Sequence, residues 1–134
     1  MSNIKEIEGI GPSFAEKLES CDIKTTDALL TKGATSAGRK EIAEKSGIGE
    51  KVILKWVNMC DLFRVKGIGQ EYSELLEAAG VDTVPELAQR NPQNLLTAMT
   101  AVNEEKKLVR KVPSETVIAN WISNAKELPK VIKH

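Results

Sequence analysis

The chain has 134 residues, enough for one ordinary domain or two very small ones, and its 41% apolar content is typical of a folded protein. Nineteen basic and 19 acidic side chains cancel, so no overall field draws it to DNA or an anionic membrane, and any phosphate-binding site must be local. No apolar segment approaches the roughly 20 residues that cross a bilayer, and the N-terminus lacks a signal peptide's apolar core, so we expect a cytoplasmic protein.

Helix signals dominate the first half of the chain. Four helices are expected there: one from the elbow Gly9-Ile10-Gly11 to Cys21, a short one capped by Thr25, one over 37–45 capped by Ser36, and one over 50–63. The last is the longest periodic segment and carries Trp56 and Cys60 on its apolar face. Gly47 is expected to end the helix before it.

The second half shows the same order of signals. Its helices are expected after the elbow Gly67-Ile68-Gly69, after the cap Thr83, after the pair Asn91-Pro92, and over 115–128 behind the cap Ser114. Gly80 lies where the first of these helices ends, a position that favours a positive φ angle. No alternating apolar and polar run of strand length occurs, so the sequence predicts an all-α fold.

The two halves of the chain align with each other. Residues 7–11 match residues 65–69 at an offset of 58, and Trp56 matches Trp121 at an offset of 65, so the second half carries about seven extra residues. Phe14 and Tyr72 also fall at matched positions. We interpret the match as an internal duplication, with one module at residues 1–62 and the other at 63–134.

Each Gly-Ile-Gly elbow is expected to join two helices through a very short hairpin. The first glycine can adopt a positive φ, the isoleucine can fill the gap between the helices, and the second glycine leaves the next helix open at its N–H groups. Small residues four positions later, Ala15 and Ser73, let the helices approach closely. An open helix N-terminus favours an anion, because unpaired N–H groups and the helix dipole both attract negative charge.

The segments IEGIGPSFAEKL (7–18), VKGIGQEYSELL (65–76) and SGIGEKVILKW (46–56) resemble helix-hairpin-helix motifs, and KVPSETVIANW (111–121) resembles a degenerate fourth. Each half is similar to the C-terminal domain of the alpha chain of bacterial RNA polymerase and to the small N-terminal domain of archaeal and eukaryotic recombinases. The whole chain resembles a bacterial domain-of-unknown-function family of tandem helix-hairpin-helix proteins. The resemblance implies two duplicated, SAM-like helix-hairpin-helix modules packed in tandem.

The resemblance also implies that hairpin N–H groups contact a DNA backbone phosphate without reading bases, and that nearby lysines or arginines assist. The expected DNA-binding residues come from the second and third hairpins: Lys45, Gly47, Gly49, Lys51, Lys66, Gly67 and Gly69. Further basic residues flank these hairpins, namely Arg39, Lys40, Lys55 and Arg64. Glu50 and Glu71 oppose a phosphate at the same places.

The first and fourth hairpins offer less to a phosphate. The first is flanked by Glu8 and loses one donor at Pro12, so we expect it to be structural. The fourth has Val112 and Ser114 where the glycines would stand, although it keeps the basic residues Lys106, Lys107, Arg110 and Lys111. The pair Lys106-Lys107 follows Glu104-Glu105, which favours a solvated helix face over a DNA-binding stripe.

Catalytic chemistry finds little support in the residue types present. The only histidine is His134, and Cys21 and Cys60 are isolated cysteines that we expect to be buried and reduced. Trp56 and Trp121 lie at apolar helical positions, so we expect core packing rather than base stacking. We therefore expect no enzyme, no metal or cofactor site and no small-molecule substrate.

Two functions remain open from the sequence. One is non-catalytic, sequence-independent binding of duplex DNA, which the three intact elbows and their basic flanks favour. The other is a protein–protein interaction adaptor, which the zero net charge, the acidic first hairpin and the eroded fourth favour. Any single elbow is equally consistent with a packing hairpin that binds no ligand.

Overall fold

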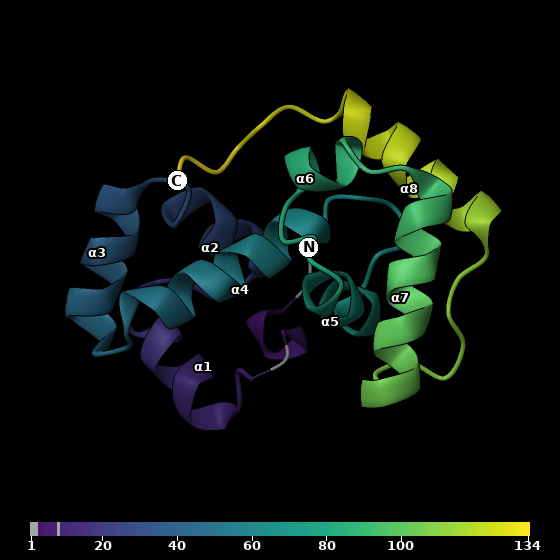
Figure 1. The fold of residues 1–134 in the computed structure, drawn as a ribbon. Coiled ribbons are helices and arrows are strands. Elements are labelled where there is room, and N and C mark those ends of the chain that lie inside the picture. The colour runs from purple at the N-terminus through teal and green to yellow at the C-terminus, as the bar shows by residue number, and fades with distance from the viewer. Residues whose placement is uncertain (1–2, 8) are drawn as a thin grey trace. The chain divides into compact units, whose positions relative to one another are not determined.

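A computed structural model describes residues 3–7 and 9–134, and α-helices make up most of that part of the chain (Figure 1). The helices are η1 (Ile4–Glu6), α1 (Pro12–Glu19), α2 (Thr26–Lys32), α3 (Ser36–Ser46), α4 (Glu50–Leu62), α5 (Gln70–Ala78), α6 (Val84–Ala88), α7 (Pro92–Lys106) and α8 (Glu115–Glu127). Within the described residues, β-pairing is limited to an isolated bridge between Asn3 and Thr25. The predicted all-α fold is confirmed.

The chain divides into two compact units. The first consists of Met1–Asp61 together with Val131–His134, and the second of Leu62–Lys130. The sequence-based division at residue 62 assigns 131–134 to the second module, whereas these residues pack on the first unit.

The last residues of the chain are held on the first unit by backbone contacts. Lys133 donates its N–H to the Ala34 carbonyl at 2.7 Å, and the Ile132 side chain is buried. The buried Arg39 guanidinium donates to the carbonyls of Lys133 at 3.0 Å and Gly33 at 2.8 Å. In Figure 1 this yellow end of the chain lies beside α2 and α3. Arg39 therefore anchors the chain end and the C-terminus of α2.

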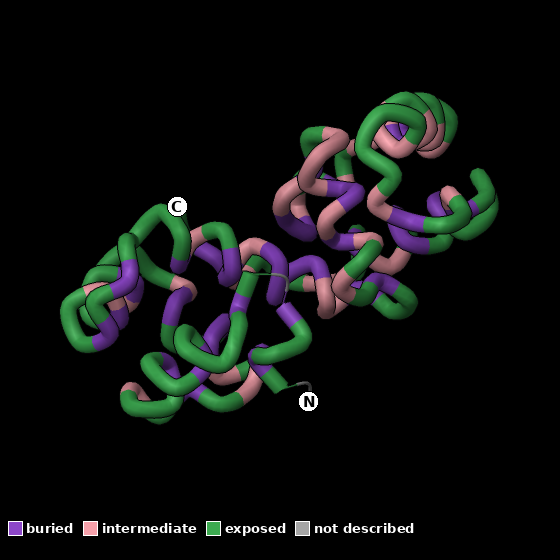
Figure 2. Tube along the Cα trace, turned by 90° about the horizontal axis from the view of Figure 1, so that it is seen from below, coloured by how far each residue is buried: buried purple, intermediate pink, exposed green. Residues whose placement is uncertain are grey.

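Each unit has its own apolar core, which the buried segments in Figure 2 trace. In the second unit the core residues include Leu62, Ile68, Leu76, Leu95, Met99, Ile118 and Trp121. In the first unit the fully buried side chains include Ile4, Ile7, Leu18, Ile23, Leu29 and Ile53. The middle isoleucines of the three elbows, Ile10, Ile48 and Ile68, are buried as expected.

In each unit the first glycine of the N-terminal elbow, Gly9 or Gly67, faces a tryptophan. Gly9 has φ +93°, and a Cβ there would lie 3.5 Å from Nε1 of Trp56. Gly67 has φ +94°, and a Cβ there would lie 3.1 Å from Nε1 of Trp121. Both tryptophans are buried, so the prediction of core packing is confirmed. Their ring partners are Phe14, at 5.3 Å from Trp56, and Tyr72, at 5.2 Å from Trp121.

Most predicted helix caps are confirmed. Thr25, Asn91 and Ser114 accept the N–H of the third residue of α2, α7 and α8, respectively. Gly47 ends α3 with φ +75°, and Gly80 follows α5 with φ +97°. These local signals therefore predict the helix ends correctly.

Two cap predictions are wrong in detail. Thr35, rather than Ser36, caps α3 by accepting the Gly38 N–H at 3.1 Å. Thr83 precedes α6 but makes no capping hydrogen bond, and its hydroxyl donates to the Glu86 carboxylate at 3.1 Å.

The cysteines differ in environment. Cys60 is buried as predicted, and its burial raises the pKa of the thiol, which therefore stays protonated at neutral pH. Cys21 lies in the turn after α1 and is only half-buried, so the prediction of a buried helical cysteine is wrong there. The helix ends at Glu19, before its apolar face reaches this position.

Candidate nucleic-acid interface

The second glycine of each intact elbow immediately precedes a helix, and Gly11 and Gly69 make no side-chain cap. A Cβ added at Gly11, Gly49 or Gly69 would meet no neighbouring atom within 4 Å, and each of these glycines is exposed. Gly11 has φ −84° and Gly69 has φ −108°, conformations that any residue adopts. Packing therefore requires glycine at none of these positions. Because glycine has no side chain, the first N–H groups of each following helix stay accessible from solvent.

The second hairpin connects α3 to α4 and is fixed by a serine. The Ser46 hydroxyl donates to the Ile42 carbonyl at 2.6 Å and accepts the Ile48 N–H at 3.2 Å. The buried Ile48 side chain holds the hairpin from inside, while Gly47 and Gly49 are exposed. The sequence alone does not reveal this role of Ser46, because a polar residue beside a glycine is common in a turn. The hydrogen bonds of Ser46 hold the hairpin in one conformation, and the exposed Gly47 and Gly49 leave its outer surface without side chains.

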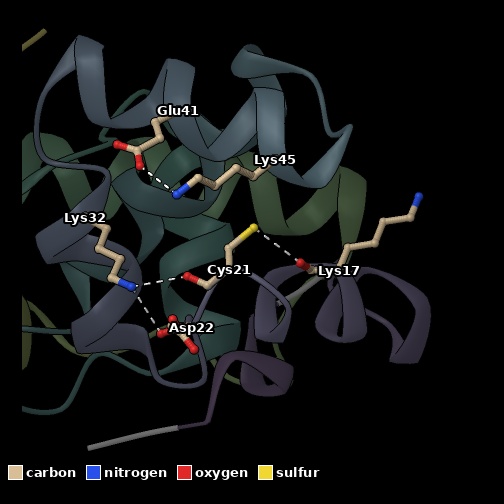
Figure 3. A network of polar contacts seen from close by, with 6 residues as sticks. All are labelled: Lys17, Cys21, Asp22, Lys32, Glu41 and Lys45. Atoms are coloured by element: carbon tan, nitrogen blue, oxygen red, sulfur yellow. Dashed lines mark hydrogen bonds and ion pairs between the residues drawn. The ribbon is translucent and has the colours of Figure 1, made fainter.

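The lysines of the second hairpin are both exposed, and one is already paired. Lys45 contacts Glu41 one helical turn earlier, with Nζ 2.8 Å from Oε1 (Figure 3). The hydrogen bond and the charge of Lys45 lower the pKa of Glu41, and the same contact raises the pKa of Lys45. Both side chains are more than 60% exposed, so solvent screens the pair and a phosphate can compete for the lysine.

A small cleft of about 260 Å³ lies behind this ion pair. Its lining includes Cys21, Lys32, Glu41 and Lys45. The Lys32 ammonium donates to the carbonyls of Cys21 at 3.2 Å and Asp22 at 3.3 Å, so it ties the turn after α1 to α2 (Figure 3). The hydrogen bonds of this cleft connect parts of the first unit to each other, which indicates a structural role for Lys32.

The Glu41–Lys45 pair leads to the first testable prediction. Replacing Glu41 with glutamine removes the competing carboxylate, so affinity for duplex DNA is expected to rise about two- to fivefold if Lys45 contacts phosphate. Fluorescence anisotropy at low salt measures the effect. The matched control is Glu44→Gln, which makes the same charge change on an exposed position of the same helix. Equal affinities of the two variants would contradict a role for Lys45.

Arg39 does not belong to the surface of the second hairpin. The sequence predicts that it assists a phosphate there, but its guanidinium is buried and donates to the Gly33 and Lys133 carbonyls. Its partner Lys133 is 94 residues away in the chain, so no local pattern could reveal the contact. Lys40 and Lys55, the other basic residues that flank this hairpin, are exposed.

The third hairpin precedes α5 in the second unit. Lys66, Gly67 and Gly69 are exposed as expected, but the Lys66 N–H is taken by the Asn124 side chain at 3.0 Å. The guanidinium of Arg64 donates to the Pro129 carbonyl at 2.6 Å. Lys66 can therefore offer its ammonium to a ligand, and Gly69 places no side-chain cap on the N-terminus of α5. Asn124 could not be found from the sequence, because it lies 58 residues from the hairpin it braces.

The first and fourth hairpins differ from these two. Pro12 is the first residue of α1, so this helix lacks one of its N-terminal donors. Glu8 lies outside the described residues. At the fourth hairpin the Ser114 hydroxyl accepts the Val117 N–H at 3.2 Å, so a side chain of the protein already occupies the N-terminus of α8.

The structure thus groups the predicted site residues into two sets. Lys45, Gly47, Gly49 and Lys51 form one hairpin of the first unit, and the other set forms a hairpin of the second unit: Lys66, Gly67 and Gly69. Among residues 3–7 and 9–134, no group of three or more His, Cys, Asp or Glu side chains could hold a metal ion. No helix in the described part of the chain has the length and apolar character needed to cross a membrane.

Comparison with known proteins identifies a family. Residues 8–128 match the sequence model of the family described as domain of unknown function DUF4332. No curated protein and no solved structure matches the chain. The match extends over both compact units, in line with the expectation of a domain-of-unknown-function family.

Proposed function

The chain belongs to the DUF4332 family, and we propose that it is a non-catalytic protein that binds duplex DNA independently of sequence. In this proposal the second and third hairpins each hold a backbone phosphate at the N-terminus of the helix that follows, α4 or α5. Lys45 and Lys51 add positive charge at the second hairpin, and Lys66 adds it at the third. Such a protein acts where DNA is present, so a cytoplasmic location is part of the proposal.

The observation that carries the proposal is the second glycine of each hairpin. Glycine at a helix N-cap lacks the side-chain oxygen with which serine, threonine or aspartate caps the N–H groups. Gly49 and Gly69 serve no packing contact that would compensate, because a Cβ at either would meet open space. Bare N–H groups and the helix dipole form an anion site, and a DNA phosphate is an anion that fits it. Contacts to phosphates do not identify the base, so binding is independent of sequence.

We further propose that the two units are duplicated helix-hairpin-helix modules. The matched φ angles of Gly9 and Gly67 support this, as does the tryptophan that faces each of these glycines. The paired rings Phe14–Trp56 and Tyr72–Trp121 support it as well. The similarity to the C-terminal domain of the RNA polymerase alpha chain and to the recombinase N-terminal domain belongs to the same proposal. Two weak sites on one chain bind one duplex more tightly than either does alone.

The experiment is a salt titration of duplex DNA binding, measured by fluorescence anisotropy. The wild type is compared with Lys45→Glu/Lys51→Glu and with a control of equal charge change, Lys5→Glu/Lys24→Glu, at exposed positions of the same unit. We expect the hairpin variant to lose about tenfold in affinity and its salt slope to fall by about two, because each lost phosphate contact removes about 0.9. Equal losses in both variants would mean that only net charge matters.

A specific observation favours the adaptor as second candidate. Three large apolar side chains of the described residues are exposed: Phe14, Val52 and Val117. Val52 and Val117 occupy matched positions near the start of α4 and α8, four residues before the two tryptophans. A partner protein that covers these valines would bind without nucleic acid. Val52→Ser/Val117→Ser would then abolish partner binding and leave DNA binding unchanged.

A further inference from the structure

The connection between α7 and α8 forms a charged cleft with the start of α5. The cleft has a volume of about 430 Å³ and is lined by Glu71, Asn103, Lys107, Leu108, Val109 and Arg110. Two of these side chains are cations and one is an anion, and the exposed Lys106 and Lys111 flank this segment in the chain. The sequence alone favours a solvated helix face for Lys106 and Lys107. The cleft places Lys107 and Arg110 together with a residue of the first turn of α5.

The backbone of this connection is held in one conformation. Asn103 accepts the Val109 N–H with its side-chain oxygen and donates its side-chain amide to the Val109 carbonyl, both at 3.0 Å. Val109 is buried in the core of the second unit and Leu108 is half-buried, whereas Lys107 and Arg110 are exposed. The two inward side chains therefore turn the two cationic residues on either side of them toward solvent.

Lys107 also occupies a backbone conformation that usually belongs to glycine. It ends α7 with φ +50° and ψ +48°, and its N–H reaches the Asn103 carbonyl at 2.8 Å. Glycine is the residue that adopts this left-handed conformation most easily at a helix end. Gly47 takes the corresponding place at the end of α3, with φ +75°. A lysine at this position keeps a cation at the cleft at some cost in backbone energy.

We propose that Lys107 and Arg110 bind a second phosphate of the DNA backbone held by the third hairpin. This inference rests on the proposed DNA-binding function and adds a contact to it. Because Ser114 already caps α8, the fourth hairpin offers cationic side chains in place of open N–H groups. The cleft includes Glu71, the second residue of α5 and two residues after Gly69, so it borders the helix whose N-terminus would hold the phosphate of the third hairpin.

The test compares paired variants in duplex DNA binding across a salt titration. Lys107→Gln/Arg110→Gln is expected to lower affinity about tenfold and the salt slope by about two. The control Lys126→Gln/Lys130→Gln makes the same charge change at exposed positions of the same unit, and we expect it to have little effect. Glu71→Gln should raise the affinity of the wild type more than that of Lys107→Gln/Arg110→Gln, because the Glu71 carboxylate opposes a phosphate in the cleft as well as one at the third hairpin, whereas the control Glu127→Gln should raise neither. A gain in affinity that Glu127→Gln does not share cannot come from the change in net charge alone.

The outcomes separate this inference from the proposed function. If the wild type binds DNA and Lys107→Gln/Arg110→Gln matches its control, the cleft contact is wrong and the hairpin proposal stands. If the wild type does not bind DNA even at low salt, the proposed function fails, and the inference fails with it. If the double variant loses binding of polyglutamate but not of DNA, the cleft takes carboxylates of a protein partner, which also overturns the inference.

Discussion

Replacing Gly49 and Gly69 together with aspartate is expected to weaken duplex DNA binding by at least about 100-fold without loss of stability. Aspartate at an N-cap accepts the N–H groups that the phosphate would use, and its charge repels the phosphate. Hydrogen bonds to charged groups contribute about 1.5–3 kcal/mol each, so losing both hairpins gives an effect of this size. Anisotropy at a fixed low salt concentration measures the affinity.

The same substitutions should leave the fold intact. Gly69 has an extended N-cap conformation, and a Cβ at Gly49 or Gly69 meets no neighbour within 4 Å. Aspartate is a better N-cap than glycine and complements the helix dipole, so stability is expected to stay equal or rise by up to about 1 kcal/mol. Gly11→Asp is the matched control, since it makes the same change at the first hairpin. If Gly11→Asp reduced DNA binding as much as the other two, the assignment of hairpins would be wrong.

Substitution of the first glycine of an elbow, in contrast, should reduce stability. Gly67→Ala is expected to reduce the free energy of unfolding by about 2–3 kcal/mol, because alanine resists the left-handed region and its methyl group crowds Trp121. A Cβ at Gly67 would lie 3.1 Å from the indole nitrogen, whereas a Cβ at Gly47 would meet nothing within 4 Å. Gly47→Ala should therefore cost only about 1 kcal/mol. Urea unfolding of both variants measures the difference, and equal losses would contradict the steric account.

The two kinds of glycine explain how much of the site the sequence could reveal. Elbow, cap and isoleucine signals act over a few residues, so Thr25, Ile48 and Gly80 behave as their local patterns predict. The sequence indicates that the second glycine of an elbow leaves a helix end open, but it could not show which first glycines pack against a side chain, as Gly67 does and Gly47 does not. That distinction depends on what lies within a few ångströms of each Cα atom, and it separates Gly67, which faces Trp121, from Gly47, which faces open space.

The features that the sequence could not predict depend on contacts between residues far apart in the chain. Arg39 carries the same charge as its surface neighbours, and only the approach of Lys133 shows that it is an internal anchor. Asn124 and Asn103 each brace the backbone near a proposed contact by side-chain hydrogen bonds that no helical periodicity encodes. The basic residues at 106–111 resemble a solvated helix face in sequence, because no local signal marks the end of α7 at Lys106.

If helix N-termini that lack a side-chain cap hold DNA phosphates, their amide groups should respond to DNA in an NMR titration. Wild-type protein labelled with ¹⁵N is titrated with a short DNA duplex at low salt, and the amide signals are followed. We predict that the N–H signals of Gly49, Lys51 and Gly69 shift most, and that those of Ser13 and Thr116, at the first and fourth hairpins, shift little. Absence of any shift, or shifts centred on Val52 and Val117 with the glycine signals unchanged, would contradict the proposed phosphate contacts.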